Sequence, residues 1–139
     1  LWAGVAATAG ADAVLDLTLD YVAGRKVFDR PLAAFENTRH RLAEVAAHLA
    51  NARAAVDGLL RARAEEAPDP ALAALARLSA SVAHDEAVDR GLQLHGGYGY
   101  MREYPISSAF ADARFLRQQE QLVADARDDV ATQLGLPAT

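Results

Sequence analysis

The feature that most constrains this chain is an unbroken stretch from Phe35 to about Glu66 in which apolar side chains recur every three or four residues. That spacing places them on one stripe of an α-helix, with charged residues on the other faces. At 1.5 Å per residue, some thirty residues make a rod roughly 45 Å long. The stretch therefore predicts one long helix whose stripe consists of Leu42, Val45, Ala46, Leu49, Ala52, Val56, Leu59 and Leu60.

Three further stretches have helical character. The first runs from about Trp2 to Phe28, is apolar on more than one side, and stops where Pro31 breaks helical hydrogen bonding. The third begins with Asp69 as N-cap and Pro70 in the first helical position, and ends at the Gly96-Gly97 pair.

A glycine- and tyrosine-rich loop leads to the fourth stretch, which we expect to begin with Ser107 as its cap and to fray after Gly135. No segment alternates with a period of two for long enough to predict a strand. The chain has 139 residues, the length of one ordinary domain, and 52% of them are hydrophobic although only 6% are aromatic. Alanine-rich helices pack closely. We therefore predict an all-α fold, a four-helix up-and-down bundle of long helices that forms a single domain over residues 1–139.

Composition excludes several classes of function. The net charge of −5 disfavours nucleic-acid binding, which needs a basic surface. The absence of cysteine excludes disulfides, thiolate metal sites and a cysteine nucleophile. Asp12 and Asp16 interrupt the apolar opening, so neither a signal peptide nor a membrane span is expected. Because the chain starts at Leu1, inside an apolar pattern, we interpret it as a piece of a longer protein.

Two short segments are unusual for a simple bundle. Residues 21–32 read YVAGRKVFDRPL, and residues 92–100 read LQLHGGYGY, followed by Glu103-Tyr104-Pro105 and Asp112-Ala113-Arg114. In this order and about 70 residues apart, they resemble two motifs from the C-terminal helical domain of the flavin-dependent acyl-CoA dehydrogenases. Those motifs are roughly Y-x-x-x-R-x-x-F-G-x-P-[LI] and Q-x-x-G-G-x-G-[YF]-x-x-E-x-P, the latter followed by R-D-A.

The resemblance implies that the bundle contributes to an FAD site at a subunit interface. Arg25 matches the arginine that meets the pyrophosphate, for which a planar fork of donors is suited. Phe28 matches the aromatic that packs on the dinucleotide. Gln93, Gly96 and Gly97 match the segment whose backbone approaches the same cofactor. Taken singly, each has an ordinary structural explanation: a helix-dipole arginine, a core phenylalanine, or a glycine cap and turn.

The catalytic base is harder to place. In many members of that family, a glutamate in an E-G-T segment removes the α-proton of the acyl thioester, and this position falls on Glu120. Gln121 and Leu122 stand where glycine and threonine are expected, and Ser108 and Ala111 replace two arginines. Glu120 is therefore either the base or a solvated residue within a continuous fourth helix. Some members carry the base at the start of the domain's first helix, a position upstream of Leu1.

Other constellations are weaker. His40, His48, His84 and His95 lack the paired Glu-x-x-His signature of a carboxylate bundle, so no metal site is predicted. Ser79 and Ser81 have no nucleophile-elbow context. The loop tyrosines Tyr98, Tyr100 and Tyr104 either stack on a ligand or anchor the turn.

The resemblance implies an FAD-dependent acyl-CoA dehydrogenase that introduces an α,β double bond into an acyl thioester. The isolated fragment is expected to be inactive. The alternative is a non-catalytic relative that serves as an oligomerisation platform, and a generic helical interaction module ranks third. The first two interpretations predict a homo- or hetero-oligomer, and the lack of cysteine favours the cytoplasm.

Overall fold

The computed structural model describes residues 1–67, 69–118 and 121–137. Over these residues, five α-helices account for most of the chain, which confirms the all-α class. A two-stranded hairpin and two short 3₁₀ turns join some of them. The helices are α1 (Trp2–Gly24), α2 (Glu36–Ala64), α3 (Pro70–His95), α4 (Pro105–Gln118) and α5 (Gln121–Gln133).

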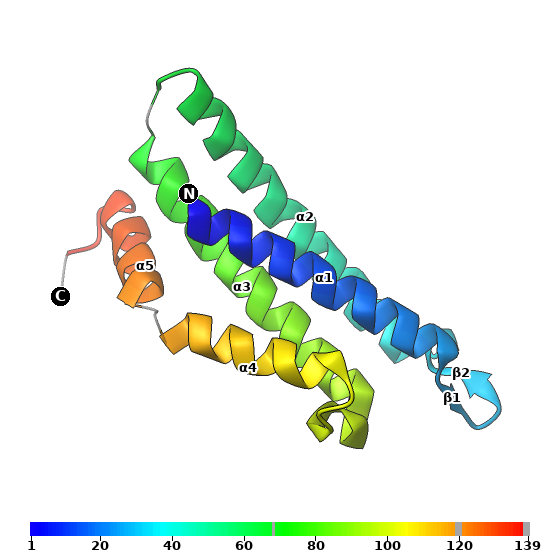
Figure 1. Cartoon of the computed structure of the whole chain (residues 1–139). Helices are drawn as coiled ribbons and strands as arrows, with labels where there is room; N and C mark the ends of the chain where they lie inside the picture. Colours follow the sequence, from blue (N-terminus) through cyan, green and yellow to red (C-terminus); the bar gives the residue numbers. More distant parts are fainter. Residues whose placement is uncertain (68, 119–120, 138–139) are drawn as a thin grey trace.

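Helix α3 is the centre of the molecule. It packs against α1, α2, α4 and α5. Figure 1 shows α1 and α2 lying lengthwise beside α3 in opposite directions, whereas α4 crosses α3 obliquely. The stripe predicted for α2 is buried at Leu42, Val45, Leu49, Ala52 and Val56. The small residues of α3 let neighbouring helices come close. A Cβ added to Gly91, for example, would lie 2.7 Å from the Oγ1 atom of Thr18.

Both ends of α3 are as the sequence predicts. The Asp69 side chain accepts a hydrogen bond of 3.0 Å from the Leu72 backbone N–H, and Pro70 is the first helical residue. Gly96 follows the last residue of the helix with a φ of 58°, a left-handed conformation that glycine adopts without steric cost. The third helix therefore has the N-cap and C-terminal glycine expected from its sequence.

The first stretch differs from the prediction in its last residues. Helix α1 ends at Gly24 rather than near Phe28, because the Arg25 carbonyl accepts a hydrogen bond from Leu32 N–H, at 2.7 Å. Strands β1 (Lys26–Val27) and β2 (Arg30–Pro31) then pair as an antiparallel hairpin, before the 3₁₀ turn η1 (Leu32–Ala34). Strands of two residues are too short to show a period of two, so the prediction of no strand was wrong here.

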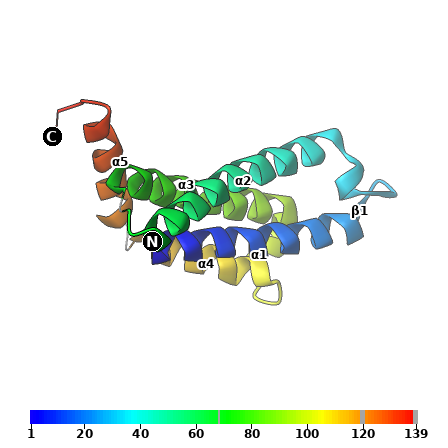
Figure 2. The same cartoon turned by 90° about the horizontal axis from the view of Figure 1, so that it is seen from above.

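The fourth stretch also differs. Helix α4 begins at Pro105, and the Ser107 hydroxyl donates to the Tyr104 carbonyl from within the first turn, so Ser107 is not the cap. Helices α4 and α5 run in different directions in Figures 1 and 2, so the fourth stretch forms two helices where the sequence predicted one. Each packs on α3: Arg114 of α4 pairs with Asp89, and Asp129 of α5 pairs with Arg77. Glu120 falls between them in the sequence, outside the described residues.

Candidate functional site

The end of α1 places Arg25 beside the end of α3. The Arg25 backbone N–H still donates to the Tyr21 carbonyl, at 2.9 Å, but its own carbonyl already belongs to the hairpin. Arg25 is thus the residue at which the chain leaves the helix, and its side chain is exposed. These two hydrogen bonds fix the Arg25 backbone, and the guanidinium projects from the junction between helix and hairpin.

The end of α3 and the turn that follows it form the other side of the site, across from Arg25. His95 is 3% exposed, and its Nδ1–H donates to the Gly91 carbonyl at 2.8 Å, which leaves Nε2 as the unprotonated nitrogen of the neutral ring. The Tyr21 hydroxyl donates to the His95 carbonyl at 3.3 Å and so ties α1 to the end of α3. The chain then enters the 3₁₀ turn η2 (Gly96–Tyr100).

Four aromatic rings form the floor of the site. Tyr21 and His95 stack with centroids 3.9 Å apart, and Tyr104 lies edge-on to both, at 6.1 and 6.3 Å. Tyr98 packs on Tyr104 at 5.0 Å. Burial lowers the pKa of His95 and raises the pKa of Tyr21, so both side chains are neutral near pH 7.

A groove of about 380 Å³ opens over this cluster. The Arg25 guanidinium carbon lies 5.1 Å above the centroid of the Tyr98 ring, at the side of the groove. Gly96 and Gly97 form part of its wall, and a Cβ added to either would meet nothing within 4 Å. The groove therefore combines a cation, aromatic faces and open backbone. It is lined by Tyr21, Arg25, Val27, Leu32, Leu94, His95, Gly96, Gly97, Tyr98 and Met101.

These features suit binding rather than catalysis. A guanidinium and accessible backbone can hold an anion, and aromatic rings can pack against a flat group. The two lining side chains with shifted pKa already have hydrogen-bond partners: the Tyr21 hydroxyl donates to the His95 carbonyl and joins α1 to α3, and the His95 ring donates to the Gly91 carbonyl within α3.

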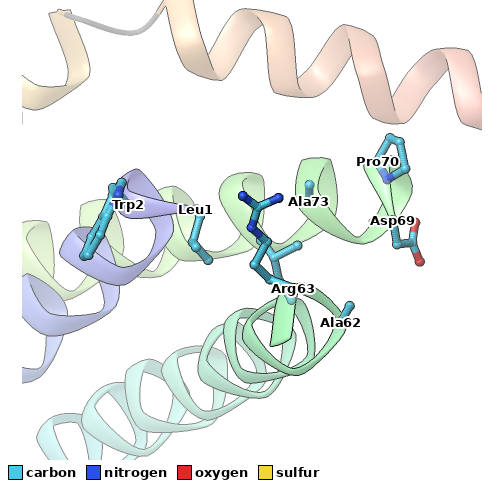
Figure 3. A pocket seen from close by; sticks show the side chains of 8 residues that line it. Leu1, Trp2, Ala62, Arg63, Asp69, Pro70 and Ala73 are labelled. Carbon is cyan, nitrogen blue, oxygen red and sulfur yellow. The ribbon is translucent and has the colours of Figure 1, made fainter. Parts of the chain in front are cut away.

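Two other hollows lie elsewhere on the protein, one larger than the groove and one of equal volume. One of about 780 Å³ runs between α1 and α2 and is lined mainly by apolar side chains, with Asp20, Arg39 and His40 at its edges. The other, of about 380 Å³, lies near the start of α1 (Figure 3). There Arg63 extends from the end of α2, and Asp69 is engaged in capping α3.

Comparison with known proteins assigns the chain to a family. The sequence model described as "Acyl-CoA dehydrogenase, C-terminal domain" matches residues 2–120. The chain belongs to the acyl-CoA dehydrogenase family. This confirms the resemblance drawn from the two motifs, because the match includes both of them.

Individual relatives agree with the family assignment. The long-chain specific acyl-CoA dehydrogenase of mouse mitochondria is 39% identical over 97 residues, which are 70% of this chain and 23% of the mouse protein. An acyl-CoA dehydrogenase crystal structure from Geobacillus kaustophilus has a TM-score of 0.90 at 28% identity, covering 96% of this chain and 35% of that one.

A glutaryl-CoA dehydrogenase from Mycobacterium smegmatis, solved in complex with FADH2, has the same fold. Its TM-score is 0.90 at 22% identity, covering 99% of this chain and 36% of that one. The chain thus spans between 23% and 36% of the length of these three proteins.

Only some residues of the two acyl-CoA dehydrogenase motifs come together in the structure. Arg25, Gly96 and Gly97 come together at the groove although about 70 residues separate them in the chain. Phe28 lies at the hairpin tip, 87% exposed, and Gln93 is an exposed residue of α3; neither lines the groove. Glu120, the proposed base, is not among the described residues.

Backbone strain marks the hairpin tip. Phe28 and Asp29 have φ values of 50° and 60°, the successive left-handed pair typical of a type I′ turn. Asp29 occupies the position that is glycine in the family motif. The strained turn therefore holds the Phe28 ring away from the protein's own core.

The sequence singled out Tyr98 and Tyr104, but it did not indicate that the Tyr21 and His95 rings complete the aromatic floor. His95 and Tyr21 join the two motifs through ring stacking and a hydrogen bond, and each residue stands within or beside a quoted motif. Their pairing depends on how α1 and α3 cross, which single-segment periodicity does not reveal. The four histidines make separate contacts, and no group of three or more potential metal ligands occurs among the described residues.

Proposed function

We propose that residues 1–139 serve as the C-terminal helical domain of an FAD-dependent acyl-CoA dehydrogenase that introduces an α,β double bond into an acyl thioester. The observation that carries this proposal is the groove where Arg25 faces Gly96 and Gly97. Family membership and the FADH2 complex of the glutaryl-CoA dehydrogenase support it.

The residues at the groove fit the diphosphate end of FAD. The Arg25 side chain has neither an ion pair nor a hydrogen bond with another side chain in the part of the chain that the structure describes, so its donors can meet phosphate oxygens. Open space beside Gly96 and Gly97 allows their backbone to approach the cofactor. Phe28, exposed on the hairpin, would pack on the dinucleotide, and Gln93 would contact it from α3.

The chemistry that FAD supplies when bound is the acceptance of hydride from the β-carbon. This domain would hold and orient the cofactor's diphosphate, and Glu120 is the proposed acceptor of the α-proton. The isolated chain is expected to be inactive.

The alternative is a non-catalytic relative that keeps the bundle as an oligomerisation platform. The departures from the family pattern at Ser108, Ala111 and Leu122 favour it. Under either function we propose a homo- or hetero-oligomer, and a cytoplasmic location. Among the described residues, no helix has the length and apolarity needed to cross a membrane.

The proposal can be tested by recording the visible spectrum of the natural polypeptide that carries this domain. Its visible spectrum should show bound flavin that bleaches when one of a panel of acyl-CoAs is added anaerobically. Glu120→Gln should retain the flavin but bleach at least about a hundredfold more slowly, because general-base catalysis contributes about 10²–10⁴ in rate. A colourless protein, or flavin that no thioester bleaches, would instead support the non-catalytic platform.

A further inference from the structure

We propose that Tyr98 is a positioning residue for the cofactor: its ring holds the Arg25 guanidinium at the side of the groove, ready to meet the FAD pyrophosphate. This inference rests on the proposed function, because it takes Arg25 as the pyrophosphate ligand. It adds a residue from a turn about 70 positions away in the sequence.

The Arg25 side chain needs a contact with another part of the chain to be held in one conformation. It stands where the chain leaves α1, and its exposed side chain has several rotatable bonds. An arginine loses up to about 2 kcal/mol of rotamer entropy when it is fixed in one geometry. Its guanidinium carbon lies over the Tyr98 ring, 5.1 Å from the ring centroid.

The Tyr98 ring is itself held in place. It packs on Tyr104 at 5.0 Å, and Tyr104 contacts the stacked pair of Tyr21 and His95. The next residue, Gly99, is buried against α3, and a Cβ added there would lie 2.9 Å from Cδ1 and 3.0 Å from the carbonyl oxygen of Leu92. The turn is therefore docked on α3, and the aromatic cluster extends from that helix to the guanidinium.

The contact also suits the chemistry of an anion site. A guanidinium above an aromatic ring interacts through the ring's π-face, and this does not use its N–H groups as a salt bridge would. A partner carboxylate would fix Arg25 equally well, but would occupy its donors and cancel its charge. Tyr98 thus can restrict Arg25 while leaving its charge and donors for phosphate oxygens.

A double-mutant cycle on the natural flavoprotein tests this inference. Apoprotein of each variant is titrated with FAD, and dissociation constants are compared. Arg25→Ala should weaken FAD binding at least about tenfold, because a charge-assisted hydrogen bond is lost. Tyr98→Leu should weaken it about two- to fivefold, the range for an exposed cation–π contact, and Tyr98→Phe should recover most of that loss.

The deciding comparison is Tyr98→Leu in the Arg25→Ala background, where we expect no additional loss of affinity. Equal weakening in both backgrounds would mean that Tyr98 acts only on the turn's structure, and would overturn the inference. If Tyr98→Leu has no effect while Arg25→Ala does, the inference fails and the proposed function stands. If Arg25→Ala has no effect, the assigned pyrophosphate contact fails too. Tyr98→Met replaces Tyr98→Leu if thermal unfolding shows that the leucine variant does not fold.

Discussion

At the scale of single residues, Gly10 determines how closely α1 approaches α3. A Cβ added to Gly10 would lie 2.8 Å from Nε2 and 3.2 Å from Cε1 of His84, a ring buried in α3. Overpacking a core costs about 1–3 kcal/mol, against a gain of about 1 kcal/mol when alanine replaces glycine in a helix. We therefore expect Gly10→Ala to lower the free energy of unfolding by about 1 kcal/mol, measured by urea denaturation.

Gly58 offers the matched control, since it also lies inside a helix. A Cβ added there would be 3.6 Å from the nearest Leu72 carbon, an ordinary contact. Gly58→Ala should therefore raise the free energy of unfolding, by up to about 1 kcal/mol. Stabilisation by both substitutions would contradict the packing of Gly10 against His84.

Residues whose role depends on a local motif could be predicted from the sequence. Asp69 and Gly96 have the capping positions expected of them, because capping depends on a few neighbouring residues. Gly10 could not be singled out, since a glycine within a helical pattern reads only as a weak helix former until the His84 ring is placed beside it. The assignment of Arg25 came from a motif, whereas its contact with Tyr98 depends on tertiary structure.

At the scale of elements, a histidine–carboxylate pair links α2 to α3. His48 Nδ1 lies 2.5 Å from an Oε atom of Glu86, and that hydrogen bond, together with the carboxylate's charge, raises the pKa of His48. A raised pKa in the folded state means that protonation favours folding. The added stability is fully present below the unfolded-state pKa of about 6.5, and is lost as the pH rises through the folded-state pKa.

His48→Gln should therefore destabilise the protein more at pH 5.5 than at pH 9. The His48 side chain is 55% exposed, so solvent screens the pair, and the expected difference is only about 0.5 kcal/mol. His40→Gln is the control, because its 3.9 Å contact with Glu36 stays within one exposed helical turn. The free energy of unfolding of both variants is measured by denaturation at the two pH values. An equal loss of stability in His48→Gln at each pH would rule out a link between His48 protonation and folding.

Element boundaries were predictable where proline or glycine marks them. Helices α2 and α3 lie close to their predicted limits, and Pro31 falls in the break after α1. No proline or glycine occurs between Pro105 and Gly135, so the sequence offered no signal for the change of direction between α4 and α5. That change follows from tertiary packing, which brings both helices against α3.

At the scale of the whole molecule, apolar surface stays uncovered around the α3 core. The second apolar side predicted for α1 is real: Leu15 and Leu19 line the hollow of about 780 Å³ between α1 and α2, where Leu15 also packs on the core and Leu19 is 44% exposed. Other large apolar side chains are also exposed, among them Trp2, Leu75, Val82, Phe115, Leu116 and Leu134. Surface of this kind marks interaction sites.

We therefore expect the 139-residue chain to self-associate as its concentration rises. Sedimentation equilibrium should give a weight-average mass above the monomer's 14.8 kDa. Raising NaCl from 0.1 to about 1 M shortens the Debye length from about 10 to about 3 Å. The oligomer should not dissociate at the higher salt concentration, because salt screens ion pairs but not apolar contacts. Dissociation by salt would assign the contact to surface charges instead. A strict monomer at every concentration would contradict association through the apolar surface, and with it the oligomer that both candidate functions require.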